Sequence, residues 1–351
     1  MKILFVAAEP GSASVLEPIV KKFTQNSDNC YAVLCSNQAK KAWINGDAQL
    51  GVVNEQNSED AYKLIAGKIN IFQPDRIVST LLGPFNSSLD QISLNLSRKY
   101  GISHFVILDS WMNIMERFAP ENTWPKTLPD KIIIPDKICL DSFLKTNFPR
   151  NRIFIGGHPG FDSLTPAVEP SRQNNAIMVL IQPLSWLKEA FGIDYGYTEK
   201  DFLILLFFAL ESFPEISVII RDHPRHPVKF KIPDAMKMRV KWSTSNDVWK
   251  EMIECKYLAG MSSTLLFQAF AHGLYTLNIQ PNLSSREDPN ILTRLQLMPL
   301  LKSVDEISAA LEKGKNRTDS DFDIERSQAK KIFPSTGSVQ RITKFIETES
   351  L

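Results

Sequence analysis

The sequence predicts an α/β protein with two Rossmann-like, doubly wound parallel-sheet domains that face a central cleft. Short apolar segments alternate with longer amphipathic segments in both halves of the chain, and a polar stretch rich in Gly and Pro interrupts the alternation near the middle. This alternation predicts repeated strand and helix units. Strands that are apolar throughout are typical of a parallel sheet with helices on both faces. A chain of 351 residues also suits two domains better than one core.

The first half of the chain contains five apolar segments that we expect to form strands. They are residues 3–7, 31–34, 76–80, 104–108 and 131–134. The amphipathic segments predict helices at residues 14–23, 37–43, 59–72 and 87–100, and the segment 138–146 follows the last strand. Ser14 is the expected N-cap of the first helix, because a serine hydroxyl accepts from free backbone N–H groups.

The second half repeats the pattern after a breaker-rich stretch between Gly156 and Asn175. We therefore expect one domain at residues 1–160, a second at residues 161–335 and a terminal segment at 336–351. The predicted strands of the second domain are residues 176–181, 216–220, 257–259 and 274–279. The predicted helices are residues 199–212, 246–251, 265–272, 304–313, 324–332 and, in the terminal segment, 339–346.

The composition argues against several classes of protein. Forty Lys and Arg balance thirty-nine Asp and Glu, and a net charge of +1 gives no reason to expect a nucleic-acid partner. Four cysteines without CxxC spacing are typical of buried thiols in a reducing compartment, which predicts a cytoplasmic protein without disulfides or zinc. The most apolar stretch, residues 202–210, is shorter than the roughly 20 residues that span a bilayer.

The end of the predicted strand 216–220 carries residues suited to an anion. Arg221 and His223 lie on one face of the extended chain, and the turn-forming Pro224 follows them. A guanidinium beside an imidazole favours a nucleotide phosphate, with a structural hydrogen bond as the alternative. His226 follows two residues after Pro224, but zinc normally takes three or four protein ligands, so we expect no metal site.

Hydroxyl groups open the predicted helix 265–272. The residues that carry them are Ser262, Ser263 and Thr264. At a helix N-terminus such hydroxyls cap free N–H groups, and together with the helix dipole they favour a bound anion. Ser185 follows the strand 176–181 and Arg286 follows the strand 274–279, so both are expected at the same edge of the sheet.

Two segments of the first domain are candidates for an acceptor site. Glu9, Gly11 and Ser12 lie in the turn after the first strand, where small residues let a ligand approach the backbone. The alternative is a turn shaped only for packing. Asp109 follows the strand 104–108, and a carboxylate there lies over the ligand crevice of a parallel sheet. It is our candidate general base, with capping of the next turn as the alternative.

A third candidate lies at the domain boundary. His158 belongs to the sequence Gly-Gly-His-Pro-Gly-Phe-Asp, and we expect it either to contact substrate in the cleft or to stand in a segment that only bends the chain.

These motifs resemble those of the GT-B superfamily of nucleotide-sugar glycosyltransferases and the related UDP-N-acetylglucosamine 2-epimerases, over nearly the whole chain. Residues 218–224 are similar to the His-Pro motif, and Ser262-Ser263 to the Ser-Ser motif, with which bacterial sialyltransferases and wall-polymer glycerophosphotransferases bind the donor nucleotide. Residues 156–162 are similar to the Gly-x-Pro-x-x-Asp turn that joins the halves of several GT-B enzymes. The resemblance implies that the helix in 336–351 crosses back to the first domain.

The resemblance also bears on the donor. Many members that use UDP-sugars carry a ribose-binding Glu where this chain has Gln268. An amide can still bond a ribose, so Gln268 is a candidate donor contact, and the donor could be CMP-, CDP- or UDP-linked. The acidic pair followed by Gly that supplies the base in those sialyltransferases is absent around Asp109.

The function that follows is a cytoplasmic, metal-independent glycosyltransferase. It would transfer a sugar from a nucleotide sugar to a glycan or lipid-linked acceptor in surface polysaccharide or glycoconjugate synthesis. Residues 161–335 would bind the donor and residues 1–160 the acceptor. Asp109 would act as base, while Arg221, His223 and the hydroxyls of Ser262 and Ser263 would neutralise the leaving phosphate.

No cofactor is expected beyond the donor substrate. The alternatives are a nucleotide-sugar 2-epimerase or hydrolase on the same fold, or a non-catalytic binding subunit. A lipid-linked acceptor would bring peripheral association with the inner face of the membrane, for which the lysines at positions 21, 22, 40 and 41 are candidates.

Overall fold

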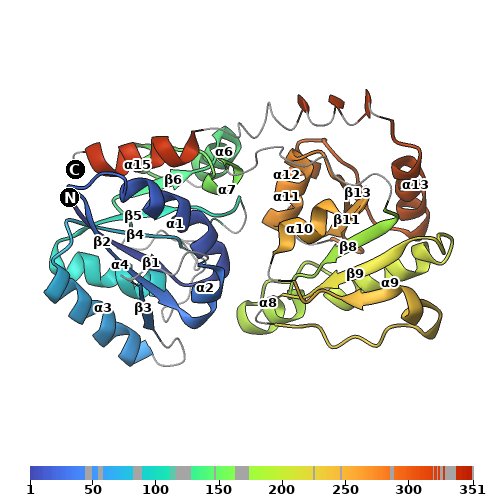
Figure 1. Cartoon of the computed structure of the whole chain (residues 1–351), viewed down its shortest axis with the longest axis horizontal. Helices are drawn as coiled ribbons and strands as arrows, with labels where there is room; N and C mark the ends of the chain where they lie inside the picture. Colours follow the sequence, from blue (N-terminus) through green and yellow to red (C-terminus); the bar gives the residue numbers. More distant parts are fainter. Residues whose placement is uncertain are drawn as a thin grey trace. The chain divides into compact units, whose positions relative to one another are not determined.

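The computed structural model describes residues 1–43, 50–53, 58–81, 89–111, 114, 128–145, 148–162, 174–223, 226–245, 247–284, 288–318, 320–321, 323–324, 327–328 and 337–349. The chain forms two compact units, one of Met1–Leu164 with Pro334–Leu351 and one of Thr165–Phe333. Each unit contains one parallel sheet flanked by helices (Figure 1). The predicted fold class, two Rossmann-like doubly wound domains, is confirmed.

The sheet of the first unit has the order β3-β2-β1-β4-β5-β6-β7 among the described residues. Its strands are β1 (Lys2–Ala7), β2 (Cys30–Ser36), β3 (Leu50–Val53), β4 (Arg76–Ser79), β5 (Ser103–Ile107), β6 (Lys131–Ile134) and β7 (Ile153–Ile155). The helices are α1 (Pro10–Phe23), α2 (Asn37–Ala42), α3 (Ser58–Phe72), α4 (Leu89–Tyr100), α6 (Lys137–Leu144), α7 (Pro159–Asp162) and α15 (Ser338–Thr348), with a 3₁₀ turn η1 (Arg150–Arg152).

Alternate residues of β1 form two separate cores in this unit. Ile3 and Phe5 pack in a cluster with residues of α1 and α15, whereas Leu4 and Val6 pack in a cluster with residues of α3 and α4. All four side chains are fully buried. Each contributes about 1.5–3 kcal/mol through burial of apolar surface. A strand that is buried on both faces therefore reads as a continuous apolar run, as β1 does.

Helix α15 lies with the first unit although it ends the chain (Figure 1). Its buried Ile342 and Ile346 belong to the same core as α1. Arg76 of β4 donates to the carbonyl oxygens of Ile346 and Glu349. Packing and hydrogen bonds together fix the returning segment on the first sheet.

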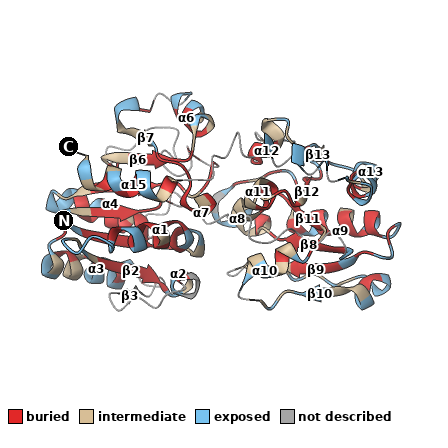
Figure 2. Cartoon of the chain, turned by 45° about the horizontal axis from the view of Figure 1, so that its top comes forward, coloured by how far each residue is buried: buried red, intermediate tan, exposed pale blue. Residues whose placement is uncertain are grey.

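The sheet of the second unit has the order β10-β9-β8-β11-β12-β13. Its strands are β8 (Ala176–Leu180), β9 (Ser217–Arg221), β10 (Val240–Trp242), β11 (Tyr257–Gly260), β12 (Tyr275–Ile279) and β13 (Leu300–Leu301). The helices are α8 (Leu184–Phe191), α9 (Glu199–Leu210), α10 (Val248–Ile253), α11 (Thr264–Ala271), α12 (Ile291–Arg294) and α13 (Val304–Lys315), with a 3₁₀ helix η2 (Asp234–Arg239). Figure 2 shows the central strands of both sheets coloured as buried.

Four strands that the sequence did not predict lie at the edges of the two sheets. They are β3 and β7 in the first sheet and β10 and β13 in the second, each of two to four residues. A run of two to four residues is too short to show the periodicity that marks a strand, even where it is apolar as in β7 and β13. The predicted helix 324–332 falls largely outside the described residues.

The expected start of α1 at Ser14 is wrong. The helix begins at Pro10 with Glu9 as N-cap. Proline is well suited to the first helical position, because its fixed φ matches the helix and it lacks an N–H that would have no partner there. The Ser14 hydroxyl instead donates to the carbonyl oxygen of Gly11 within the helix.

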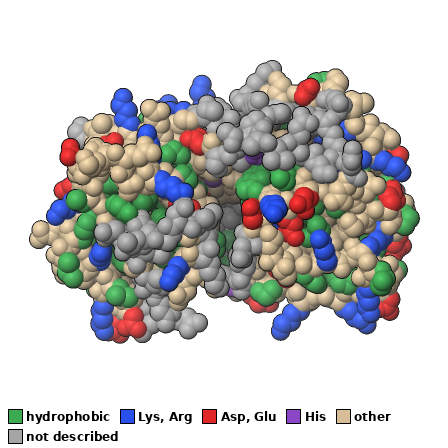
Figure 3. Space-filling model, in the orientation of Figure 1, with side chains coloured by type: hydrophobic (Ala, Val, Ile, Leu, Met, Phe, Trp, Pro, Cys, Tyr) green, Lys and Arg blue, Asp and Glu red, His purple; other side chains and the backbone are tan. Residues whose placement is uncertain are grey.

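Charge is spread over both units. Figure 3 shows basic and acidic side chains interspersed on the visible face. Among the described residues no helix is long and apolar enough to cross a membrane.

Candidate functional site

Each sheet has one point at which the strand order reverses. The reversal lies between β1 and β4 in the first unit and between β8 and β11 in the second. In open α/β sheets, ligands bind outside the carboxyl ends of the strands at this point. Two groups of residues lie at or after the carboxyl ends of the strands at these points and of the next strand, β5 in the first sheet and β9 in the second. We call them the first-unit edge, Ala8–Ser12, Thr80 and Asp109, and the second-unit edge, Gln182–Trp186, Arg221–His223, His226 and Ser262–Thr264.

At the second-unit edge a hydrogen-bonded pair spans the reversal point. Gln182, which follows β8, accepts through Oε1 from the backbone N–H of Ser262 at 2.6 Å and from its hydroxyl at 3.1 Å. Ser262 is only 3% exposed. Ser263 caps α11, since its hydroxyl accepts from the N–H of Leu265 at 3.2 Å. The two serines therefore shape the turn, and Ser263 together with the half-buried Thr264 borders the N-terminus of α11.

Ser185 lies in the first turn of α8, a helix that the sequence did not predict. Its backbone N–H donates to Oε2 of Glu199 at 2.9 Å, and Glu199 is buried. A carboxylate next to the N-terminus of a helix is stabilised by the positive end of the helix dipole. The Glu199 carboxylate thus accepts from the backbone N–H that an anionic ligand could otherwise bind. A ligand at this helix start would meet the hydroxyl of Ser185 and not its N–H.

Arg221 ends β9 and is anchored toward the neighbouring edge strand. Its Nη1 donates to the Ser243 hydroxyl at 3.0 Å and to the Ser245 carbonyl at 2.8 Å, and it lies 3.9 Å from a carboxylate oxygen of Glu251. Burial lowers the pKa of Arg221, while the charge of Glu251 raises it. A guanidinium held on one side in this way is fixed in direction, which suits recognition of a phosphate.

The rings of three residues at the second-unit edge stack on one another. The Trp186 ring stacks on His226 with centroids 4.0 Å apart, and His226 stacks on His223 with centroids 5.7 Å apart. All three side chains are half-buried. His223 was a candidate from the sequence, whereas Trp186 was not, because no helix was predicted at residues 184–191. Pro224 and Arg286 lie outside the described residues.

A buried polar network supports the turn before Ser262. The side-chain amide of Asn290 donates to the Met261 carbonyl at 2.8 Å. Gln280 donates to Asp288 at 2.6 Å and accepts from the Tyr197 hydroxyl at 3.0 Å. Burial raises the pKa of Tyr197. No periodicity in the sequence marks these residues, since their partners are far apart in the chain. Gln268, the expected ribose contact, is half-buried on α11.

The expected turn over Gly11 and Ser12 is wrong, because both residues lie in the first turn of α1 and Glu9 is its N-cap. At the first-unit edge this first helical turn and the segment after β5 come together. A Cβ added at Gly11 would lie 3.2 Å from Oδ2 of Asp109. The Ser12 hydroxyl is fully buried and bonds the Thr80 hydroxyl at 2.5 Å across the reversal point. It also accepts from the backbone N–H of Glu9 at 3.3 Å. The structure thus brings Asp109 next to Gly11, and it gives Ser12 a partner within the protein.

His158 lies at the start of α7 in the first unit and is 6% exposed. Its Nε2 is 3.0 Å from the Asp109 carbonyl oxygen, and its Nδ1 accepts from the N–H of Gly160 at 3.1 Å. Burial lowers its pKa, and the groups of Asp109 and Asp162 oppose that effect. His158 therefore touches the candidate base through the backbone.

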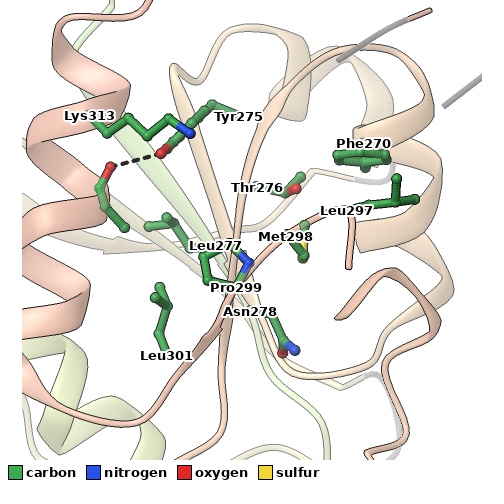
Figure 4. A pocket seen from close by; sticks show the side chains of 11 residues that line it. Phe270, Tyr275, Thr276, Leu277, Asn278, Leu297, Met298, Pro299, Leu301 and Lys313 are labelled. Carbon is green, nitrogen blue, oxygen red and sulfur yellow. Dashed lines mark hydrogen bonds between the residues drawn. The ribbon is translucent and has the colours of Figure 1, made fainter. Parts of the chain in front are cut away.

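A small cavity lies beside β12 in the second unit. It has a volume of about 50 Å³, and Figure 4 shows Tyr275 and Thr276 from the start of β12 among the side chains around it. Ligand sites for molecules of drug size take roughly 300 Å³ or more, so this cavity is too small for a nucleotide. In the part of the chain that the structure describes, no cluster of His, Cys, Asp and Glu could hold a metal ion.

Comparison with known proteins gives a likeness in structure only. No family model matches the chain, and no curated protein sequence is significantly similar to it. UDP-GlcNAc 2-epimerase from Neisseria meningitidis, bound to UDP-GlcNAc, is similar with a TM-score of 0.68 at 11% identity, over 99% of this chain and 100% of that one. The UDP-GlcNAc 2-epimerase of Methanocaldococcus jannaschii, in complex with UDP-GlcNAc and UDP, gives 0.66 at 12%, over 99% and 100%.

A glycosyltransferase is also similar. The glycotransferase of kitacinnamycin has a TM-score of 0.64 at 12% identity, over 99% of this chain and 98% of that one. Because identities this low carry information about the backbone and not about the site, the likeness shows the fold. The chain has the GT-B fold of two Rossmann-like domains.

Proposed function

We propose that the chain is a glycosyltransferase that takes its sugar from a nucleotide-sugar donor. One observation carries the proposal: the second-unit edge gathers the Arg221 guanidinium, the His223 ring and the N-terminus of α11 with its Ser263 cap at one sheet edge. Charged and hydrogen-bonding groups of this kind stabilise the negative charge that develops on a leaving nucleotide phosphate. Its position on a GT-B fold supports the assignment as a donor site.

The chemistry of transfer needs a base for the acceptor hydroxyl. Asp109 is the candidate, since it lies at the carboxyl end of the first sheet beside the exposed Gly11. It would take the proton as the hydroxyl attacks the anomeric carbon, and the bond from that carbon to the phosphate oxygen would break. No metal ion enters this scheme, so turnover is expected to survive treatment with EDTA.

A 2-epimerase or hydrolase of a nucleotide sugar is the second candidate. Similar structures named UDP-GlcNAc 2-epimerase, which cover 99% of this chain, favour it. Such an enzyme needs no acceptor besides water. The nucleotide would sit at the same second-unit edge in either case, so the donor assignment does not depend on the choice.

Product analysis by NMR separates the two reactions. The full chain is incubated with each of UDP-, CDP- and CMP-linked sugars, first alone and then with a glycan or lipid-linked acceptor. A transferase leaves the donor sugar unchanged at C2 and releases nucleotide when acceptor is added. An epimerase inverts C2 without acceptor, and a hydrolase releases free sugar. Binding without turnover under every condition would indicate a non-catalytic subunit and would overturn the proposed activity.

Membrane association belongs to the same proposal, because a lipid-linked acceptor resides in a bilayer. Lys21 and Lys22 are exposed in the last turn of α1. Basic residues near a surface attract anionic lipids, each worth about 1 kcal/mol. Sedimentation with vesicles of anionic lipid is expected to carry the chain down at low salt, and replacement of both lysines by Gln to reduce that fraction.

A further inference from the structure

The two ring nitrogens of His158 are both committed to backbone groups. Because a backbone N–H can only donate, the bond from Gly160 at 3.1 Å requires Nδ1 to be an acceptor. The hydrogen of the neutral ring is therefore on Nε2, which donates it to the Asp109 carbonyl oxygen at 3.0 Å. A protonated imidazolium has two donors and could not accept from Gly160.

Two aromatic side chains also contact the His158 ring, one stacked on it and one edge-on. Trp111 stacks on it at a centroid distance of 5.7 Å with an interplanar angle of 9°, and Phe161 meets it edge-on at 5.1 Å. The Trp111 ring is itself fixed, since its Nε1–H donates to Asp136 at 2.8 Å. An imidazole enclosed in this way cannot turn to a different partner without disturbing Trp111.

The segment that carries His158 is anchored to helix α15. The Asp162 carboxylate accepts from the backbone N–H groups of Ser338 at 3.0 Å and Val339 at 2.6 Å. Gly157 has φ +95°, and a Cβ there would lie 2.2 Å from the Ser338 hydroxyl oxygen, so only glycine fits. The His158 ring thus projects from a rigid support.

Asp109 follows the part of its strand that pairs with β6. Ladder pairing of β5 with β6 runs to Ile107, and the N–H of Leu108 still donates to the Ile133 carbonyl. Beyond it, the Asp109 carbonyl is held by His158. Its carboxylate oxygen lies so close to Gly11 that an added Cβ there would be 3.2 Å away, so a shift of the Asp109 backbone would move the carboxylate relative to Gly11.

We propose that His158 is a positioning residue for Asp109: its Nε2–H fixes the Asp109 peptide and thereby aims the carboxylate at the turn around Gly11. In this arrangement His158 does not contact substrate. The inference rests on the proposed role of Asp109 as the base. It gives the Gly-x-Pro-x-x-Asp segment a function besides joining the two halves of the chain.

Two substitutions at one position separate this role from simple packing. In His158→Asn the amide group ends near the place of Nδ1, so it can accept from Gly160 but cannot reach Asp109. In His158→Gln the amide group ends near the place of Nε2, so it can donate to Asp109 and loses Gly160. Each variant gives up one hydrogen bond, and we expect comparable losses in Tm.

The first readout is NMR and needs no substrate. The backbone amide of Ser110 belongs to the same peptide group as the Asp109 carbonyl, so its proton resonance reports the bond from His158. We expect this resonance to stay near the wild-type position in His158→Gln and to move upfield in His158→Asn. The wild-type ring should also show a protonated Nε2 and an unprotonated Nδ1. A protonated Nδ1, or equal Ser110 shifts in both variants, overturns the proposal.

The second readout is turnover with the donor that the product analysis identifies. Misplacing a reacting group costs roughly tenfold to a hundredfold in rate, so kcat should fall by that amount in His158→Asn with KM little changed, while His158→Gln keeps most of it. Equal kcat in the two variants contradicts positioning. If Asp109→Asn keeps wild-type turnover, the role of Asp109 as base fails, and the Ser110 resonance still decides whether His158 holds that peptide.

Discussion

The two units have the same architecture at their reversal points and different chemistry around them. In each, the segment after the first strand bonds the segment after the fourth, through Ser12 of α1 and Thr80 in one unit and through Gln182 and Ser262 in the other. The first-unit edge adds a carboxylate, Asp109. The second adds a guanidinium and an imidazole, Arg221 and His223. The backbone fixes where a ligand can bind, and a few side chains decide which charge it carries.

The largest expected effect concerns the carboxylate of the first unit. Replacing Asp109 by Asn keeps the shape and removes the base, which should lower kcat by about 10²–10⁴-fold. Nucleotide affinity should not change, because the proposed nucleotide site lies in the second unit. Steady-state kinetics and calorimetric titration check the two halves of this expectation. A loss of nucleotide affinity as large as the loss of kcat would contradict the assignment of the base to the first unit and of the nucleotide site to the second.

The next effect concerns the guanidinium of the second unit. Arg221→Gln should weaken nucleotide binding by roughly 10- to 100-fold, since a hydrogen bond to a charged group contributes about 1.5–3 kcal/mol. Lys241→Gln is the matched control, because it removes one positive charge from the exposed side of the neighbouring strand β10. Fluorescence titration of both variants is the measurement. Equal losses would point to general charge attraction instead of a site at Arg221.

A smaller effect concerns the free energy of unfolding. It compares the hydrogen bond between Ser12 and Thr80, the first bridge, with those between Gln182 and Ser262, the second bridge. Gln182→Leu leaves the buried N–H and hydroxyl of Ser262 without their acceptor, which costs about 1–3 kcal/mol in the free energy of unfolding. Thr80→Val removes one hydroxyl from a pair and should cost about 1 kcal/mol. Denaturant melts of both variants test the order. A larger loss in Thr80→Val would show that the first bridge is the stronger one.

The last effect is a difference in acid sensitivity between the units. Burial lowers the pKa of His104 in the first unit from 6.5 to about 3. Between these pKa values the unfolded chain binds a proton more readily than the folded one. His104 therefore leaves the free energy of unfolding unchanged above pH 6.5 and lowers it increasingly as the pH falls toward 3. Hydrogen exchange should show β4 and β5 opening more easily at pH 5 than at pH 7. His104→Gln should remove that change, and an unaltered pH dependence in this variant would assign it to other groups.

Central strands and long helices could be predicted from the sequence, because burial on both faces or on one face leaves a clear apolar pattern. The edge strands β3, β7, β10 and β13 could not, since two to four residues are too few to show a pattern. The same limit applies to the sites. Asp109 and Arg221 became candidates because they follow or end apolar strands, whereas Trp186, Glu199 and Asn290 act through partners that only the folded chain brings near.

Calorimetric titration of the full chain with UDP, CDP, CMP, GDP and their sugars tests the central claim most directly. We expect at least one nucleotide sugar to bind through its phosphates. Its affinity should fall in Arg221→Gln and should not fall in Lys241→Gln. If no member of the panel binds the wild-type chain, or if the nucleotide binds Arg221→Gln as tightly as the wild type, the second-unit edge is not a donor site.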